Sequence, residues 1–233
     1  MTASQRPHKT KAVKGSWAEL DTAVATMPEG QRKIFEAAVD EFAEHGFAGS
    51  STLAIAERAG VSEGLIFKYF KSKAALLRQV VFPVLATAIM PLAIRGVKSV
   101  TDAEHESFAE FLGALIHERF DFARRHKKHL RILLQELPLN EELRSRMVKG
   151  LQSELLPVIS QKIAHYQKQG KLRTMPVAQM LSYLVPQIMG FVLSRAVFAF
   201  EFAANEEQDI KTLIEVMMHG VAAPEQADKR GKK

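Results

Sequence analysis

The sequence has 233 residues, a formal net charge of +6, 47% hydrophobic and 25% charged residues, and no cysteine. This composition is ordinary for a folded protein with a sizeable core, and the length suits one large domain or two small ones. The lack of cysteine excludes disulfides, thiolate metal sites and cysteine nucleophiles, and it is compatible with a reducing cytoplasm.

Residues 1–27 form a predicted basic, flexible arm. It contains Arg6, Lys9, Lys11 and Lys14, with no acid before Glu19. No apolar run follows these charges, so we expect no secretory signal. Two interpretations of the arm stay open: a solubilising terminus, or a segment that reaches into a DNA minor groove.

A predicted helix spans about Gln31 to His45, because its apolar residues recur at steps of three and four. Gly46 should end it, since glycine adopts the left-handed conformation at little steric cost. Next, Ser50, Ser51 and Thr52 offer hydroxyl groups to cap a second, short helix that ends at Gly60. Ser62 can cap a third helix, which continues to Phe70.

This succession of two short helices around a glycine turn is the outline of a helix-turn-helix, in which the second helix enters the DNA major groove. An ordinary αα-hairpin with no role in binding has the same outline. The turn alone does not decide between them.

The longer run AIAERAGVSEGLIFKYFKSKAALL, at 54–77, resembles the N-terminal signature of the tetracycline-repressor (TetR) family of bacterial transcriptional regulators. The resemblance implies an all-α fold with a helix-turn-helix DNA-binding domain at 28–75. A larger helical ligand-binding and dimerisation domain follows at 76–222, and a charged tail at 223–233.

The side chains expected at DNA lie on or beside the two short helices. They are Ser51, Thr52, Ser62, Glu63, Gly64, Leu65, Phe67, Lys68, Tyr69, Lys71 and Lys73, and the lysines among them should meet phosphates. The chain departs from the family pattern at Leu65 and Phe67, where threonine and tyrosine are frequent. The preference for particular DNA sequences should therefore differ from that of family members with threonine and tyrosine at these positions. Ala75 also stands where a glutamate would complete the capping box begun by Ser72.

The rest of the chain reads as helices, with no alternating strand pattern or phosphate-binding loop. We expect them at 72–94, 103–125, 127–137, 141–169, 177–202 and 209–220. Pro83 and Pro91 should kink or end the first of these.

A basic cluster at 119–131 is interpreted as a solvated helix end, with attraction to DNA or binding of an acidic ligand as the alternatives. It includes His126 and His129, which are spaced closely enough for a metal site. The surrounding cations argue against one. No metal, cofactor or enzymatic activity is expected, since no catalytic motif is present.

The segment 177–202 is the most apolar. Its polar residues and Pro186 argue against a membrane span and favour a buried helix. With the amphipathic helix after it, it resembles the pair through which members of this family form homodimers. The expected interface residues are Phe191, Arg195, Phe198, Leu213 and Met217.

The expected effector is a small, mainly apolar molecule, because such pockets are apolar with a few polar groups. Its candidate contacts are Phe111, Leu115, His117, Leu133, Leu137, Tyr183, Gln187 and Ile188. The predicted function is that of a cytoplasmic, ligand-responsive homodimeric regulator, a repressor, that binds a palindromic operator. The alternatives are an architectural DNA-binding protein without regulation and a metabolite-binding protein with a degenerate DNA-binding domain.

Overall fold

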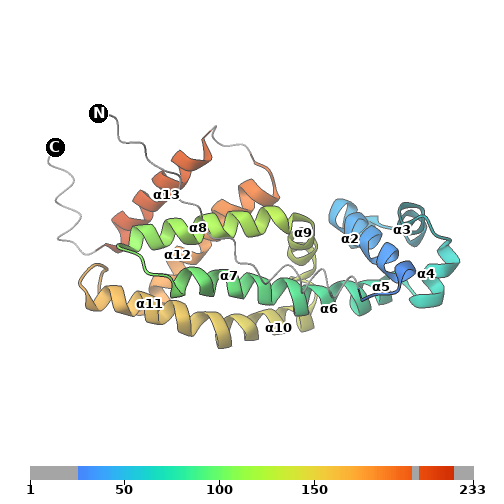
Figure 1. The fold of residues 1–233 in the computed structure, drawn as a ribbon, viewed down its shortest axis with the longest axis horizontal. Coiled ribbons are helices and arrows are strands. Elements are labelled where there is room, and N and C mark those ends of the chain that lie inside the picture. Colours follow the sequence, from blue (N-terminus) through green and yellow to red (C-terminus); the bar gives the residue numbers. More distant parts are fainter. Residues whose placement is uncertain (1–25, 201–204, 223–233) are drawn as a thin grey trace.

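The computed structural model describes residues 26–200 and 205–222, and it confirms the all-α fold (Figure 1). Most of the basic arm at 1–27 and the whole tail at 223–233 lie outside the described residues. The N-terminal helices are α2 (Glu29–Gly49), α3 (Thr52–Ala59) and α4 (Glu63–Tyr69). Beyond them come α8 (Phe108–Arg125), α9 (Lys127–Glu136), α12 (Val177–Val192), η4 (Leu193–Val197) and α13 (Glu206–Val221).

The helices α2, α3 and α4 lie at one end of the elongated molecule (Figure 1), and their core continues along the helical stretch after α4 as far as Ile89 and includes Ile132. Ile34, Ile55 and Ile66, one from each helix, are fully buried in it. Gly46 interrupts α2 with a φ of 71°, as the sequence predicted, and the Ser50 hydroxyl donates to its carbonyl oxygen.

The turn between α3 and α4 has the predicted geometry. Ser51 caps α3, because its hydroxyl oxygen accepts from the Ala54 N–H at 3.0 Å. Gly60 ends α3 in the left-handed conformation, with a φ of 65°. Ser62 begins α4 without a side-chain capping bond, so the prediction that its hydroxyl caps this helix is wrong.

The connection to the second half is one long helical stretch that runs to Asp102, so the expected end near Ile94 is wrong. Its parts are α5 (Lys73–Leu76), η1 (Leu77–Val81), α6 (Phe82–Val84), η2 (Leu85–Ile89) and α7 (Met90–Asp102). The π-helical turns η1 and η2 each end two residues before a proline, Pro83 and Pro91 respectively. Widened turns absorb a proline that lacks an N–H, so the chain continues as a helix instead of ending there.

The second half has a separate, larger core, in which α8 packs against α7, α12 and α13. After α9, the helix α10 (Glu141–Gly150) continues through η3 (Leu151–Leu155) into α11 (Leu156–Lys168), as predicted for 141–169. The expected start of α8 at Ala103 is wrong, because Ser107 caps it and the helix begins at Phe108. The expected extension of α12 to Phe202 is also wrong within the described residues, since Ala199 has a φ of 57°.

Among the described residues, Val177–Val197 is the one helix long and apolar enough to cross a membrane by length and composition. Met180, Leu184 and Ile188 on one side of it belong to the larger core. Its other side carries exposed Ser182 and Gln187. A core helix with one uncovered side accounts for this pattern.

Candidate nucleic-acid interface

The helix α4 presents three different sides. Ile66 points into the N-terminal core, and Leu65 and Tyr69 lie toward the first turn of α2. A Cβ placed on Gly30 would be 3.7 Å from Leu65 and 3.8 Å from Tyr69. Leu65 and Tyr69 are therefore half-buried against α2, and they are less available to a partner than the sequence suggested.

The outward side of this region consists of Gly64, Phe67 and Lys68 on α4, with Lys71 just after it. A Cβ on Gly64 would meet only the Ser62 hydroxyl, at 4.0 Å, so other backbones or ligands can approach closely here. The structure thus shows which residues of the predicted recognition helix face solvent.

A hydrogen bond joins the N-terminal turns of α3 and α4. The Thr52 hydroxyl donates to Oε1 of Glu63 at 2.6 Å. Both residues are candidates from the sequence, and the structure brings them into direct contact. The bond fixes the angle between the two short helices and occupies one oxygen of the Glu63 carboxylate.

Lys73 has a different role from the one predicted. Its ammonium group donates to the carbonyl oxygens of Phe47 at 2.5 Å and Ser50 at 2.7 Å, and it lies 4.4 Å from the centre of the Phe47 ring. It therefore ties the start of α5 to the last turn of α2 and to Ser50, which lies between α2 and α3. The expected phosphate contact by Lys73 is corrected to this internal clamp, while Lys71 remains exposed.

An ionic network holds α3 on α2. Arg58 donates to both carboxylate oxygens of Glu44, at 3.0 and 2.7 Å, and lies 3.9 Å from Asp40. The hydrogen bond with Glu44 raises the pKa of Arg58, and the same bond lowers the pKa of Glu44. Asp40 also accepts from Lys128 of α9 at 2.6 Å, so α9 contacts the N-terminal unit directly.

The basic cluster at 119–131 is partly neutralised within the chain. Arg124 pairs with Glu206, and Arg119 pairs with Glu118. His126 is only 2% exposed, and its pKa is lowered to about 4, chiefly by burial and then by the charge of His129 and nearby arginines. Among the residues that the structure describes, no group of three histidine or acidic side chains is suited to a metal ion.

The eight candidate effector contacts do not form one pocket. Phe111, Leu115 and Ile188 share the larger core, whereas Tyr183 and Gln187 lie on the uncovered side of α12. The remaining three are dispersed: His117 is exposed beside Glu207 at 3.6 Å, Leu133 is buried in α9, and Leu137 is half-buried at its end. Helical spacing identified apolar faces correctly but did not distinguish which faces converge.

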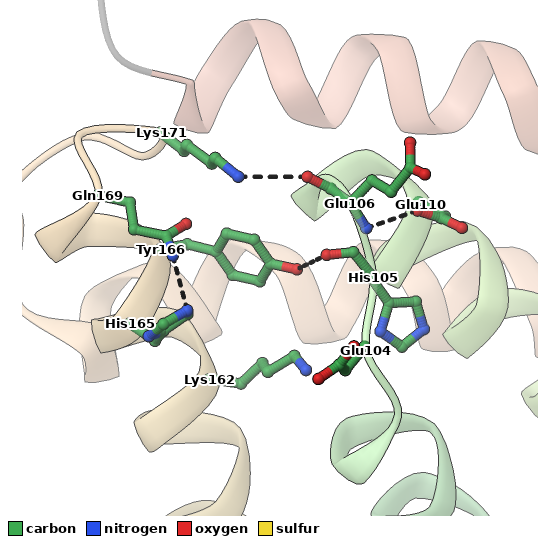
Figure 2. Close-up of a pocket in the computed structure, with 9 residues that line it drawn as sticks. All are labelled: Glu104, His105, Glu106, Glu110, Lys162, His165, Tyr166, Gln169 and Lys171. Carbon is green, nitrogen blue, oxygen red and sulfur yellow. Dashed lines mark hydrogen bonds between the residues drawn. The ribbon is translucent and has the colours of Figure 1, made fainter.

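A polar hollow of about 470 Å³ lies instead between the loop 103–107 and the end of α11, where no sequence pattern predicted a site (Figure 2). The Lys162 ammonium donates to the Ala103 carbonyl at 2.8 Å, and the Tyr166 hydroxyl donates to the His105 carbonyl at 3.2 Å. Because Lys162 and Tyr166 already donate hydrogen bonds to the loop, these polar groups hold α11 to the connection between α7 and α8.

The predicted dimer residues differ in exposure. Met217 is 2% exposed in the chain's own core, so its predicted contact with a partner is wrong. Arg195 donates to Asp209 at 3.0 Å and thereby joins η4 to α13. Phe191 and Leu213 pack partly on the larger core, and Phe198 is exposed.

Further exposed apolar residues are Tyr183, Val185 and Met189 on α12 and Val216 on α13. Apart from Tyr183, which was assigned to the effector, sequence reasoning missed them. Gly190 lies among them, and a Cβ there would meet nothing within 4 Å. A glycine inside a helix costs about 1 kcal/mol relative to alanine, and no contact among the described residues requires Gly190 to lack a side chain.

Comparison with known proteins gives a consistent result for the N-terminal region. Residues 34–80 match the model described as bacterial regulatory proteins, tetR family. The HTH-type transcriptional regulator RutR of Escherichia coli O157:H7 is 30% identical over 144 residues, which are 61% of this chain and 64% of RutR. YerO of Bacillus subtilis, an uncharacterized HTH-type transcriptional regulator, is 29% identical over 126 residues, or 53% of this chain and 42% of YerO. The chain thus aligns with less than two thirds of either relative.

Solved structures share the fold over most of the chain. The ketosteroid transcriptional regulator KstR2 of Mycobacterium tuberculosis has a TM-score of 0.61 at 17% identity, covering 82% of this chain and 94% of that one. The transcriptional regulator FadR from Bacillus subtilis, in complex with stearoyl-CoA, has a TM-score of 0.54 at 20% identity, covering 80% and 95%. At these identities the likeness concerns the fold alone.

Proposed function

The chain belongs to the tetR family of bacterial regulatory proteins, and we propose that it is a ligand-responsive transcriptional repressor that binds a palindromic operator as a homodimer. The observation that carries this proposal is the geometry of α3 and α4. Two short helices meet at a left-handed glycine, share a Thr52–Glu63 hydrogen bond, and expose Lys68 and Lys71. In such a pair the second helix lies in the major groove.

The proposed division of labour assigns DNA binding to the N-terminal helices and the other contacts to the helices that follow. Residues 28–75 would bind DNA, with Ser51, Gly64, Phe67, Lys68 and Lys71 as the outward contacts. Residues 76–222 would bind the effector and the second subunit. The long helical stretch that ends at Asp102 connects the two, and the ion pair between Asp40 and Lys128 makes a second contact.

A second copy of this chain is the proposed partner for the exposed faces of α12 and α13. Its exposed apolar residues and the open space at Gly190 would be covered, and a twofold arrangement presents two α4 helices to two half-sites.

Val216→Glu tests the dimer, since the side chain of Val216 is mostly solvent-exposed and the substitution leaves the core intact. We expect the variant to sediment as a monomer at concentrations where the wild type sediments as a dimer. Leu139→Glu is the matched control, because Leu139 is also exposed but lies between α9 and α10. Equal sedimentation of the wild type and Val216→Glu would contradict this interface.

The proposed effector is a small, mainly apolar molecule that enters the larger core near Phe111, Leu115 and Ile188. Release of DNA requires that it bind the state incompetent for DNA more tightly, since equal affinity for both states shifts nothing. Stearoyl-CoA is a suitable first probe, because FadR from Bacillus subtilis was crystallised with it. A cytoplasmic location is proposed with this function.

Selection of bound fragments from a random DNA pool at near-physiological salt tests the proposal as a whole. Enrichment of a palindrome would support a dimeric sequence reader. Enrichment without a motif would favour the architectural alternative, in which phosphate contacts dominate and binding falls steeply with salt. Binding of a metabolite with no binding of DNA would favour a degenerate DNA-binding domain.

A further inference from the structure

The outward side of the proposed reading helix is apolar at its centre. Phe67 is 48% exposed on α4, and Leu53, near the start of α3, is 54% exposed. Neither side chain carries a hydrogen-bonding group. A partner that covers such a side chain gains the free energy of removing its apolar surface from water.

The polar neighbours of Phe67 are arranged differently. Glu63, one helical turn earlier, already accepts a hydrogen bond from Thr52 at 2.6 Å. Lys68 and Lys71 are exposed and carry positive charge, which suits phosphate groups on either side of a groove. Gly64 has open space where a Cβ would stand, so the helix can approach closely. Phe67 is thus the large side chain on this surface, with Gly64 before it in the sequence and the two lysines after it.

Only thymine presents a methyl group in the major groove, and apolar side chains recognise it by direct contact. We infer that Phe67 reads a thymine C5-methyl group in each half-site of the operator, so that sequence preference at this position comes from apolar contact instead of hydrogen bonding. This inference rests on the proposed function. It assigns Phe67 as a specificity-determining residue and a thymine as its counterpart.

Deoxyuridine tests the inference, because it pairs as thymine does and lacks only the methyl group. Each thymine of the selected operator is replaced in turn, and the dissociation constant is measured with the full chain. At one position we expect affinity to fall about fourfold for one half-site and about fifteenfold when both half-sites are changed.

Two variants assign the contact. Phe67→Ala should bind the thymine and deoxyuridine operators equally, and because Phe67 is outside the core, its circular dichroism and melting temperature should match the wild type. Leu53→Ala is the matched control: it removes another exposed apolar side chain, and it should keep the full discrimination at this position.

Every outcome is decisive. Discrimination by the wild type that is lost in Phe67→Ala supports the inference. If a palindrome is bound but no deoxyuridine substitution changes affinity, the inference fails while the proposed function stands. If no specific sequence is bound, the proposed function fails and the inference fails with it. Discrimination that persists in Phe67→Ala would move the methyl contact to another residue and overturn the assignment.

Discussion

Replacing Lys73 should destabilise the protein without removing a DNA contact. The Lys73 ammonium donates to two carbonyl oxygens, at 2.5 and 2.7 Å, and lies over the Phe47 ring. A hydrogen bond to a charged group contributes about 1.5–3 kcal/mol, and partial exposure reduces this. We therefore expect Lys73→Ala to lower the free energy of unfolding by about 2–3 kcal/mol.

The assay is urea unfolding followed by circular dichroism, at matched protein concentration. Lys73→Met keeps the apolar stem and removes the charge, so a similar loss in this variant would assign the effect to the ammonium group. Lys71→Ala is the control from the same turn, and because Lys71 is exposed, its unfolding free energy should change by less than about 0.5 kcal/mol.

Operator binding should show the reverse pattern: the Lys71 substitution should affect it directly, and the Lys73 substitution should not. Lys71→Ala should reduce the slope of log affinity against log salt by about two for the dimer, about one for each subunit, and Lys73→Ala should leave the slope unchanged. If Lys73→Ala keeps its stability and loses the salt slope, Lys73 is a phosphate contact and the clamp interpretation is refuted.

Two further substitutions probe the fold. Gly60→Ala should lower the free energy of unfolding by about 1 kcal/mol through backbone strain alone, because φ is 65° and no atom lies within 4 Å of an added Cβ; an unchanged denaturation midpoint would contradict this. His126 has a folded pKa of about 4, below its value of about 6.5 when unfolded, so its neutral ring contributes stability that is fully present above pH 6.5 and is lost as the pH falls toward 4. We expect up to about 3 kcal/mol of acid destabilisation from this residue, and His126→Gln should unfold with a flatter dependence between pH 6.5 and 4 than the wild type. Equal pH dependence in the two proteins would refute the assignment to His126.

Local signals in the sequence predicted the N-terminal unit well. Gly46 and Gly60 are required by backbone conformations that other residues rarely adopt, and the hydroxyls of Ser51 and Ser72 cap helices as expected. Such features depend on a few neighbouring residues, so a sequence pattern can carry them. The capping of α4 by Ser62 failed because its hydroxyl is not bonded to the helix start.

Long-range contacts were harder to predict. Lys73 bonds to the carbonyl oxygens of Phe47 and Ser50, which lie 26 and 23 positions earlier in the chain. No sequence pattern near Lys73 predicts these partners. Likewise, Tyr183 and Met217 both lie on amphipathic helices, but only packing shows that Tyr183 is exposed and Met217 buried. The predicted helix at 72–94 already ran through Pro83 and Pro91, and π-helical turns accommodate both prolines, but no local signal indicated that the helix continues to Asp102.

The spacing of half-sites tests the central claim most directly. Two recognition helices held by one dimer must meet the same face of the duplex, with half-sites a whole number of turns, about 10.5 base pairs each, apart. Inserting five base pairs at the centre of the selected operator turns one half-site to the opposite face. The account predicts that the full chain then loses at least tenfold in affinity, falling to that for a single half-site. Equal affinity for the two spacings would contradict a rigid dimeric reader.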